Sequence, residues 1–437
     1  MHTNVVSAPA ETFLDRIATR DARVGIVGLG YAGLPLALAF AEAGFATTGL
    51  ELNPDRVAAV RDGRSYLVDV PEERYAAAEG RLDATDDFTA VAELDALTIC
   101  VPTPLQNLRP DLGYVKRAAE SVAAHIRPGT LVVLQSTTTP GTTEELLAPI
   151  FEAAGLRVGE DVFLGYAPER VDPGNAVWNL RNTPKIVSGV SEECRERTHA
   201  VYETVVETIV PVSSPTVAEM VKLHENTFRA VNIGLANELA LMCDKLGISA
   251  WEVIDAAKTK PFAFMAHYPG PGVGGDCIPV VPHFLTWRLR EKGYVTRMVD
   301  AAHAVNSDMP LHVAGKVVDA LNDVGRSVKG SRILVLGVTY KPDVHDTRES
   351  PALDVIRELD RRGGSVHYCD PYVDSVLVGD RLHERRPWSF AEMAEADCIV
   401  MLVPHREFLE RPHWRKAELL VDAGNHVPGE RPGLWRL

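Results

Sequence analysis

The sequence predicts an α/β protein in which two doubly wound parallel-sheet domains are joined by a long central helix. Three observations support this prediction. An apolar run that ends at Gly28 is followed by a helical pattern, a helical stretch extends from Thr216 to Leu246, and a second strand–helix–strand unit begins at Arg332. Strands that alternate with helices are typical of parallel sheets whose faces are covered by helices.

The first sheet is predicted from short, mostly apolar runs, of which the first stops at Gly28 and the second at Glu51. Such runs indicate buried parallel strands, because both faces of these strands meet helices. The expected strands are residues 23–28, 46–50, 96–101 and 130–134, and the first helix is expected over residues 34–43. They place the first α/β domain at about residues 20–210.

The middle of the chain is predicted to be helical. Pro215 and Thr216 can begin a helix and Gly247 can end it, so one helix is expected over residues 216–246. At ~1.5 Å per residue it would be roughly 46 Å long, which is enough to bridge two domains and to pair with a second chain. Shorter helices are expected over residues 251–257 and 284–292, on either side of an irregular, glycine- and proline-rich segment.

The C-terminal part repeats the strand–helix–strand pattern. Strands are expected over residues 332–337, 365–369 and 398–403, with a helix over residues 351–362. The predicted division of the chain is therefore residues 1–210, 211–319 and 320–437.

Composition and charge restrict the class of partner. The 437-residue chain has a formal net charge of −15, and an acidic surface repels phosphate backbones, so no nucleic-acid partner is expected. No apolar run approaches the ~18 residues of a membrane span, and the first 23 residues lack the apolar core of a signal peptide. We therefore expect a cytoplasmic protein without membrane contact. The six cysteines form no Cys-x-x-Cys pair, and no metal site is expected.

The segment Gly28-Leu-Gly30-Tyr31-Ala32-Gly33 matches the dinucleotide-binding fingerprint GxGxxG, between a predicted strand and a predicted helix. Gly28 permits a tight turn, Gly30 lets a pyrophosphate approach the backbone, and Gly33 lets the helix pack on the sheet. The N-terminus of the helix then presents N–H groups to the anion.

Glu51 follows the second predicted strand, 18 residues beyond Gly33. A carboxylate here accepts hydrogen bonds from the ribose hydroxyls and repels a 2′-phosphate. The sequence therefore predicts NAD as the cofactor, although a nearby arginine, Arg56, is a feature that would favour NADP.

Seven motifs along the chain resemble those of the UDP-glucose/GDP-mannose dehydrogenase family, from about Arg23 to His405. The motifs are most similar to those of the branch that oxidises UDP-N-acetylhexosamines. The motifs are Gly28-Leu-Gly-Tyr-Ala-Gly-Leu-Pro35, Val101-Pro-Thr-Pro104, Ser136-Thr-Thr-Thr-Pro-Gly141, Ala167-Pro-Glu-Arg170, Glu219-Met-Val-Lys-Leu-His-Glu-Asn226, Gly270-Pro-Gly-Val-Gly-Gly-Asp-Cys-Ile-Pro279 and Tyr340-Lys-Pro-Asp-Val-His-Asp-Thr-Arg-Glu-Ser350. The resemblance implies an N-terminal NAD-binding domain and a C-terminal nucleotide-sugar-binding domain, both Rossmann-like, on either side of a helix that forms a homodimer.

The resemblance also implies a reaction, the four-electron oxidation of a primary alcohol to a uronate. Cys277 would add to the intermediate aldehyde to give a thiohemiacetal and then a thioester. Lys222 and Asn226 are four residues apart, so they share one helix face, and they would stabilise the oxyanion. Glu169 would position water or act as a general base, and Thr137 would hold that water near the nicotinamide. We interpret the other cysteines as core residues.

The resemblance assigns the remaining contacts as well. Arg170 and Asp172 would contact either the sugar or only each other. The cofactor residues implied are Gly28, Gly30, Tyr31, Ala32, Gly33, Glu51, Arg56, Thr103, Thr137 and Arg348. The substrate residues implied are Glu169, Arg170, Lys222, Asn226, Tyr268, Gly274, Tyr340 and Lys341.

The sequence departs from the family near the substrate. The family usually has an aspartate four residues after the catalytic cysteine, where this chain has Val281. Three outcomes are open: Asp276 or Glu169 replaces the missing carboxylate, hydrolysis of the thioester is slow, or the reaction stops at the aldehyde. The family also tends to carry an arginine near Phe262 and Ala263, where Lys260 is the nearest cation. An unusual sugar is a hypothesis that fits these changes.

Three alternatives to the uronate-forming enzyme remain. The first is a two-electron dehydrogenase of the same family that releases the 6-aldehyde. The second is a β-hydroxyacid dehydrogenase, which has a Rossmann domain and a long helix but needs no cysteine. The third is a binding protein that has lost catalysis and senses NAD or a nucleotide sugar.

Overall fold

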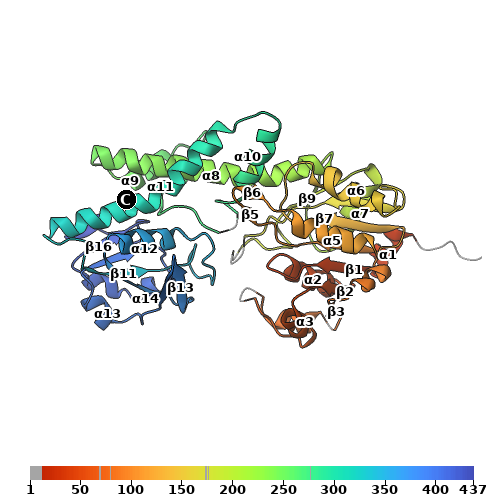
Figure 1. The fold of residues 1–437 in the computed structure, drawn as a ribbon, viewed down its shortest axis with the longest axis horizontal. Coiled ribbons are helices and arrows are strands. Elements are labelled where there is room, and N and C mark those ends of the chain that lie inside the picture. The colour runs from red at the N-terminus through yellow and green to blue at the C-terminus, as the bar shows by residue number, and fades with distance from the viewer. Residues whose placement is uncertain (1–11, 68–69, 79, 173–174, 176, 276) are drawn as a thin grey trace, which may run out of the picture. The chain divides into compact units, whose positions relative to one another are not determined.

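The computed structural model of this chain divides into two compact units, Met1–His224 and Glu225–Leu437. The structure describes residues 12–67, 70–78, 80–172, 175, 177–275 and 277–437. Each unit contains a sheet with helices packed on it, and the long helix α8 (Pro215–Leu246) includes the boundary between them (Figure 1). The predicted fold class is confirmed. Within the described residues, no helix is both long and apolar enough to cross a membrane.

The first unit is built on an eight-stranded sheet of order β10-β9-β8-β7-β4-β1-β2-β3. The four predicted strands are β1, β2, β4 and β7, and their ends lie within two residues of the predicted ones. The strands are β1 (Arg23–Val27), β2 (Ala46–Leu50), β3 (Leu82–Thr85), β4 (Ala96–Ile99), β7 (Thr130–Leu134), β8 (Val162–Tyr166), β9 (Lys185–Gly189) and β10 (Ile209–Pro211), with a hairpin of β5 (Leu105–Gln106) and β6 (Arg109–Pro110).

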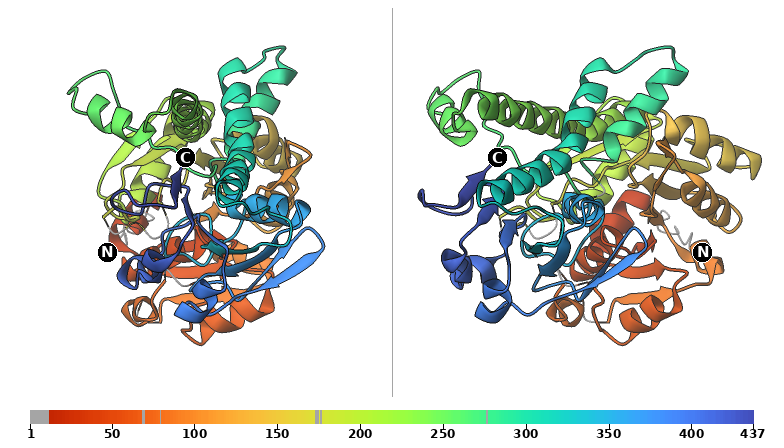
Figure 2. Two further views of the ribbon diagram at one scale, coloured as in Figure 1. Left: turned by 90° about the vertical axis from the view of Figure 1, so that its left-hand side faces the viewer. Right: turned by 60° about the vertical axis from the view of Figure 1, so that its left-hand side comes forward.

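Helices cover both faces of this sheet because successive strand residues point to opposite sides. Ile26 packs in a cluster with residues of α2 and α7, whereas its neighbour Val27 packs in a second cluster with residues of α5 and α6. α2 lies along β1 and β2, as the red segment of Figure 2 shows. The helices are α1 (Phe13–Thr19), α2 (Gly33–Glu42), α3 (Pro54–Arg61), α4 (Glu73–Ala77), α5 (Gly113–Ala123), α6 (Ala148–Ala153) and α7 (Glu192–Tyr202), with short turns η1 (Phe88–Glu93) and η2 (Thr143–Leu147).

The four predicted strands pair in parallel, but one pair of strands that was not predicted departs from this pattern. β8 and β9 are antiparallel, with Gly165 opposite Gly189 and Tyr166 opposite Ser188. A parallel pair needs a crossover connection, usually a helix, and the described part of the chain between these two strands contains none. The N-terminal end of β9 therefore lies at the edge of the sheet where β8 ends, which places Lys185 beside the residues that follow Tyr166.

The second unit begins within α8, whose observed start at Pro215 is one residue before the predicted one. A second long helix, α11 (Arg297–Asp323), was not predicted, because Pro310 lies inside it and proline normally ends a helix. Pro310 is buried within the second unit, although it lies inside the helix. The other helices are α9 (Ala250–Ala257), α10 (Val281–Glu291), α12 (Pro351–Arg361), α13 (Phe390–Ala394) and α14 (Arg406–Glu410), with a turn η3 (His413–Lys416).

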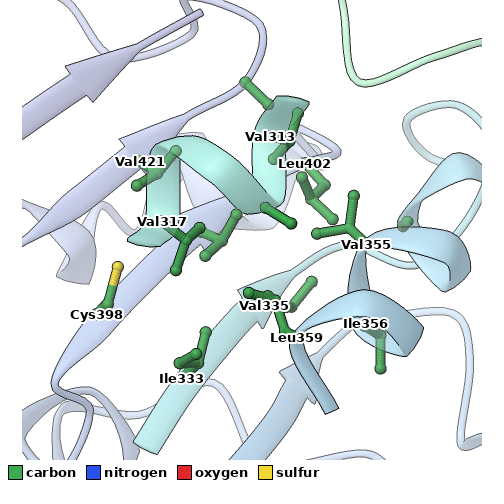
Figure 3. Close-up of a cluster of buried hydrophobic side chains, with 14 of the residues drawn as sticks. Val313, Val317, Ile333, Val335, Val355, Ile356, Leu359, Cys398, Leu402 and Val421 are labelled. Atoms are coloured by element: carbon green, nitrogen blue, oxygen red, sulfur yellow. The ribbon is translucent and has the colours of Figure 1, made fainter. Parts of the chain in front are cut away.

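The sheet of the second unit has the order β12-β11-β15-β16-β17 and is parallel throughout. Its core is formed where α11 and α12 pack on it, and Figure 3 shows Val313 and Val317 of α11 facing Val355 of α12 and Val335 of the sheet. The strands are β11 (Arg332–Leu336), β12 (Ser365–Cys369), β15 (Cys398–Met401), β16 (Leu420–Asp422) and β17 (Leu434–Arg436), with a hairpin of β13 (Ser375–Val378) and β14 (Arg381–Glu384).

The two units share a backbone arrangement at the end of their second strand. In the first unit, Glu51 accepts the N–H of Leu29 at 3.0 Å. In the second unit, Asp370 accepts the N–H of Val338 at 2.8 Å. The same oxygen of Asp370, Oδ2, also lies 3.0 Å from Nε2 of the buried His405. The architectural likeness of the two halves therefore extends to an acidic residue that fixes the loop after the first strand.

Candidate functional site

The three glycines after β1 serve different structural purposes. Gly28 has φ +89°, and its N–H donates to the Leu50 carbonyl at 2.8 Å. A Cβ on Gly33 would lie 1.9 Å from the Gly28 carbonyl oxygen, so α2 can approach β1 only with glycine here. A Cβ on Gly30 would meet no atom within 4 Å. The fold does not require glycine at residue 30, but a pyrophosphate against this backbone does, so the loop fits a dinucleotide.

Glu51 is held at the end of β2 by this loop. One carboxylate oxygen accepts the N–H of Leu29, and the other accepts the N–H of Asn53 at 3.0 Å. Arg56 places a guanidinium nitrogen 3.3 Å from Glu51, so the arginine is already paired with a carboxylate. Oε2 accepts from both Leu29 and Arg56, whereas Oε1 accepts only from Asn53 and keeps a lone pair for a hydroxyl donor. This arrangement fits NAD and removes the argument for NADP that Arg56 offered.

The other expected residues of the first unit also lie where parallel strands end. Tyr31, Ala32 and Thr103 are in the loops after β1 and β4, and Thr137 follows β7. Tyr31 is exposed, whereas Ala32, Thr103 and Thr137 are partly buried. Ligands of open α/β sheets bind outside the carboxyl ends of the strands, which is the edge that carries these residues.

Glu169, just beyond β8, is surrounded by hydrogen-bond donors. Its Oε1 accepts the backbone N–H groups of Arg170 and Val171, both at 2.8 Å. Its Oε2 lies 3.1 Å from Nε2 of Gln135 and 3.3 Å from Nζ of Lys185. These four donors fix the orientation of the carboxylate.

The charge of Glu169 is fixed by the same neighbours. Burial alone would raise its pKa, but Lys185, the two backbone N–H groups and Lys222 together hold the pKa below its ordinary value. A carboxylate with a lowered pKa is ionised at neutral pH and is a weak base. The geometry therefore favours a positioning role for Glu169 over the general-base role.

Lys222 lies on the first turns of α8, where Glu219 anchors the helix to the loop before η2. The buried Glu219 carboxylate accepts the N–H of Gly141 at 2.5 Å, the N–H of Thr143 at 2.9 Å and the Thr143 hydroxyl at 2.7 Å. Lys222 is only 9% exposed. Because Glu219 is one turn away from Lys222, these bonds fix the position of the lysine.

Burial raises the pKa of Glu219 to about 7, despite the donors from Thr143 and Gly141. When the pKa of a group is higher in the folded state than in the unfolded state, the protonated group stabilises the fold. This stabilisation is complete below the unfolded-state pKa and is lost as the pH rises through the folded-state pKa. We expect the wild type, relative to Glu219→Gln, to gain about 2 kcal/mol of unfolding free energy between pH 8.5 and pH 5.5. Urea unfolding of both proteins at several pH values measures this difference. Parallel stability curves would show that Glu219 does not titrate in this range.

Asn226 is one turn beyond Lys222 on α8 and belongs to the second unit. Its side-chain Nδ2 is buried and has no hydrogen-bond partner in the described protein. A buried donor without a partner is unfavourable unless a ligand satisfies it. The amide is therefore available to bind an oxygen atom of a substrate.

Cys277 is exposed, and the glycine loop before it packs on the segment after β11. A Cβ on Gly274 would lie 2.7 Å from Tyr340 Cβ and 2.8 Å from the Glu349 carbonyl oxygen, so only glycine fits. Gly275 has φ +77°, lies under the Tyr340 ring, and donates its N–H to the Arg348 carbonyl at 3.0 Å. Tyr340 and Gly274, both expected substrate residues, are therefore in direct contact.

Lys341 and Arg348 belong to the same segment as Tyr340. The Lys341 ammonium lies 5.8 Å from the centre of the Tyr340 ring, and Arg348 donates to Asp346 at 2.6 Å. The buried His405 holds the backbone of this segment, since its Nδ1 accepts the N–H of Asp343 at 3.0 Å. The segment thus presents two cations on a backbone held by buried contacts.

Val281, the departure from the family, is the first residue of α10 and is 4% exposed. Its N–H donates to the Cys277 carbonyl at 3.2 Å, but its side chain offers no acceptor. Asp276, one candidate replacement, lies outside the described residues. Glu169 is the other, and its carboxylate is held by Gln135, Lys185 and two backbone N–H groups.

Tyr268 and Lys260 lie in the irregular segment before Cys277. The Tyr268 hydroxyl donates to Asp255 at 2.8 Å and accepts from Lys258 at 2.9 Å, so α9 orients the ring. Lys260 lies 4.9 Å from the centre of the exposed Phe262 ring.

Sequence reasoning missed Gln135, Lys185 and Glu219 as parts of the site. Gln135 and Lys185 belong to no motif, and a lysine at the start of an apolar strand is normally solvated. Glu219 begins one of the seven motifs, but a glutamate on a helix is also normally solvated, so no role was assigned to it. Of the five cysteines interpreted as core residues, Cys100 is partly buried. The other four are buried, namely Cys194, Cys243, Cys369 and Cys398. Within the described residues, no group of His, Cys, Asp and Glu side chains could hold a metal ion.

Comparison with known proteins covers almost the whole chain. Residues 22–206 match the NAD binding domain of the UDP-glucose/GDP-mannose dehydrogenase family, residues 216–308 its central domain and residues 334–428 its UDP binding domain. A UDP-N-acetyl-D-mannosamine dehydrogenase of Pyrococcus horikoshii is 36% identical over 415 residues, which are 93% of this chain and 96% of the relative. A UDP-N-acetyl-D-glucosamine 6-dehydrogenase of Pseudomonas aeruginosa is 34% identical over 394 residues, which are 89% of this chain and 92% of the relative.

Solved structures agree with the sequence matches. The structure of a UDP-D-ManNAc dehydrogenase from Pyrococcus horikoshii matches with a TM-score of 0.86 and 34% identity, over 95% of this chain and 98% of the other. The family suggested by the seven motifs is confirmed, as is NAD as the cofactor. The chain belongs to the UDP-glucose/GDP-mannose dehydrogenase family and is an NAD-dependent oxidoreductase.

Proposed function

We propose that this protein oxidises the C6 primary alcohol of a UDP-N-acetylhexosamine to the uronate. The observation that carries the proposal is the exposed Cys277, which follows a glycine loop packed on Tyr340 in the UDP-binding region. The sugar class is supported by the relatives from Pyrococcus horikoshii and Pseudomonas aeruginosa, whose names state UDP-N-acetyl-D-mannosamine and UDP-N-acetyl-D-glucosamine.

Two NAD molecules, bound one after the other, would each accept one of the two hydrides that leave C6. We assign Lys222 and Asn226 to the C6 oxygen, where they stabilise negative charge as the hydroxyl proton leaves. The Cys277 thiolate adds to the aldehyde carbon to form a thiohemiacetal, which becomes a thioester when the second hydride leaves. Water then displaces the sulfur, which returns to the thiol as the uronate is released.

We assign the hydrolytic water to Thr137 and Glu169. The fixed negative charge of Glu169 orients both the Lys222 ammonium and the water, which is the task that the missing aspartate at residue 281 would otherwise perform. The lowered pKa of Glu169 supports this assignment, because the carboxylate is charged throughout the neutral range.

The remaining expected residues are proposed contacts to the two ligands. We assign the cofactor to Gly28, Gly30, Tyr31, Ala32, Gly33, Glu51, Arg56, Thr103, Thr137 and Arg348. We assign the nucleotide sugar to Arg170, Tyr268, Gly274, Tyr340 and Lys341. The proposed division into an NAD domain (1–210), a helical region (211–319) and a nucleotide-sugar domain (320–437) is supported by the three family matches.

A two-electron reaction that releases the 6-aldehyde is the second candidate, and Val281 favours it. We would incubate the enzyme with excess NAD and limiting UDP-N-acetylglucosamine, UDP-N-acetylmannosamine, UDP-glucose or UDP-galactose, and count the NADH formed per sugar. Two NADH support the uronate. One NADH, with an aldehyde trapped by hydroxylamine, overturns it in favour of the aldehyde. NAD binding without NADH from any of the four sugars favours a non-catalytic sensor. Ordinary turnover of UDP-N-acetylglucosamine would contradict the hypothesis of an unusual sugar.

We also propose that the protein is a homodimer that pairs through α8. Phe228, Leu235 and Met242 are exposed and recur every seven residues, and Leu246 continues the same stripe. Seven-residue spacing of apolar side chains is typical of helices that pair side by side, and a stripe of this size is normally covered. A cytoplasmic location stays a prediction.

Leu235→Glu is expected to weaken this dimer by at least about tenfold, because it places a charge in the centre of the apolar stripe. Sedimentation velocity over a range of protein concentrations measures the change. Arg229→Glu is the control, since Arg229 is exposed on α8 but lies off the stripe. Equal dissociation of both variants, or of neither, would contradict the assigned interface.

A further inference from the structure

Lys185 is a buried cation to which the proposed reaction assigns no role. Its side chain is 3% exposed, at the start of β9. Nζ donates to Oε1 of Gln135 at 3.0 Å and lies 3.3 Å from Oε2 of Glu169. A buried ammonium is unfavourable unless it is paired and hydrogen-bonded, and the next strand residues, Ile186 and Val187, are buried apolar ones. A lysine at this position therefore needs an explanation beyond strand formation.

We infer that Lys185 is a positioning residue for Glu169, which it holds in one orientation as a charged group for the hydrolysis of the thioester. The inference rests on the proposed function of Glu169. Lys185 thereby lets Glu169 serve in place of the carboxylate that Val281 lacks.

The sheet topology brings the two residues together. Tyr166 is opposite Ser188 in the antiparallel pair of β8 and β9. Continuing this register by three residues past β8 leads to Glu169 on one side and Lys185 on the other. If β9 ran parallel to β8, Lys185 would lie at the other end of the strands, beside the start of β8, and could not reach the Glu169 carboxylate.

Gln135 connects the pair to the rest of the core. Its amide nitrogen donates to Glu169, and its amide oxygen accepts from Lys185 and, at 3.0 Å, from the Tyr202 hydroxyl. Tyr202 in turn lies 3.3 Å from the Thr98 hydroxyl on β4. Gln135, just after β7, and Tyr202 of α7, whose ring centre lies 5.2 Å from Nζ, therefore hold Lys185 beside Glu169.

The charged and titratable groups around Glu169 come from several elements. Lys185 on β9 and Lys222 on α8 favour the ionised form of Glu169 and so lower its pKa. Arg170 donates a guanidinium N–H to the Pro184 carbonyl at 2.6 Å. Cys100, after β4, is neutral because burial raises the pKa of its thiol to about 12. Burial lowers the pKa of Lys185, while Glu169 opposes that change. Removing Lys185 therefore removes the larger of the two lysine charges that lower the pKa of Glu169, and Lys222 remains.

Lys185→Met tests the inference, because methionine fills a similar volume without charge. We expect the acid limb of the kcat profile to move about one pH unit upward, and kcat at pH 7 to fall by about 10- to 100-fold with KM for the sugar within about threefold of wild type. Lys185→Arg should recover most of the activity. Tyr202→Phe, which removes a hydroxyl from the same cluster but no charge, should leave the acid limb in place.

A uniform loss of kcat at every pH, without movement of the acid limb, would show a merely structural role and overturn the inference. So would a Lys185→Met enzyme that matches the wild type, or a Tyr202→Phe enzyme with the same shift as Lys185→Met. A second readout needs no substrate. In protein labelled with ¹³C at the glutamate carboxyl carbons, the Glu169 resonance is identified by its loss in Glu169→Gln, and it should titrate at higher pH in Lys185→Met. If the wild type forms no uronate, the proposed function fails, but this titration still decides whether Lys185 controls the charge of Glu169.

Discussion

Cys277→Ala is expected to abolish uronate formation, with a fall in kcat of at least about 10⁴-fold, the order seen when a nucleophile is removed from a covalent catalyst. Alanine leaves no atom that can add to the aldehyde, so the thiohemiacetal and the thioester cannot form. The exposure of Cys277 means that loss of the sulfur costs little stability. NADH formation, together with product analysis by mass spectrometry, measures the effect.

Cys243→Ala is the matched control, because Cys243 is a buried cysteine of α8 in the same unit. This variant should lose some stability through the small cavity but keep full uronate formation. Unchanged production of uronate by Cys277→Ala would exclude covalent catalysis by this residue. Release of the aldehyde by Cys277→Ala, with one NADH per sugar, would agree with the proposed order of the two oxidations.

Gly33→Ala is expected to destabilise the first unit and to remove measurable NAD binding. Its methyl group would lie 1.9 Å from the backbone oxygen of Gly28, so α2 must move away from β1. Such overpacking costs about 1–3 kcal/mol or more, and it also displaces the N–H groups at the start of the helix. Thermal unfolding and calorimetric titration with NAD measure the two effects.

Gly30→Ala separates ligand binding from folding at the same loop. Its methyl group would meet no protein atom within 4 Å, so Tm should stay close to the wild-type value. The methyl group nevertheless occupies the space that we assign to the pyrophosphate, and NAD affinity should fall by about tenfold or more. A Gly30→Ala protein with wild-type NAD affinity would place the cofactor elsewhere. A Gly33→Ala protein with wild-type Tm would contradict the close contact of α2 with β1.

Local signals explain why so much of the fold could be predicted. The runs at β1, β7 and β11 are short, mostly apolar and next to a glycine, so each identifies a strand without knowledge of its neighbours. α8 was found because Pro215 and Gly247 mark its two ends. α11 was missed because Pro310 reads locally as a helix end, and only its burial against the rest of the unit shows why the helix continues.

The candidate site was predicted only in part, for a related reason. Motif residues such as Cys277, Lys222 and Glu169 could be named because their order along the chain matches a family. The partners of Glu169 could not be named, because Gln135 is 34 residues away and Lys185 is 16 residues away, and neither belongs to a motif.

The two α/β units, the dinucleotide loop, the preference for NAD and the family could all be predicted from the sequence alone. These follow from periodicity, from glycine spacing and from motif order, which are local properties of the chain. Only the tertiary structure decided that β9 runs antiparallel to β8 and that Lys185 is buried against Glu169. Strand direction and burial depend on contacts between distant segments, so the charge balance at the site could not be read from residue order alone.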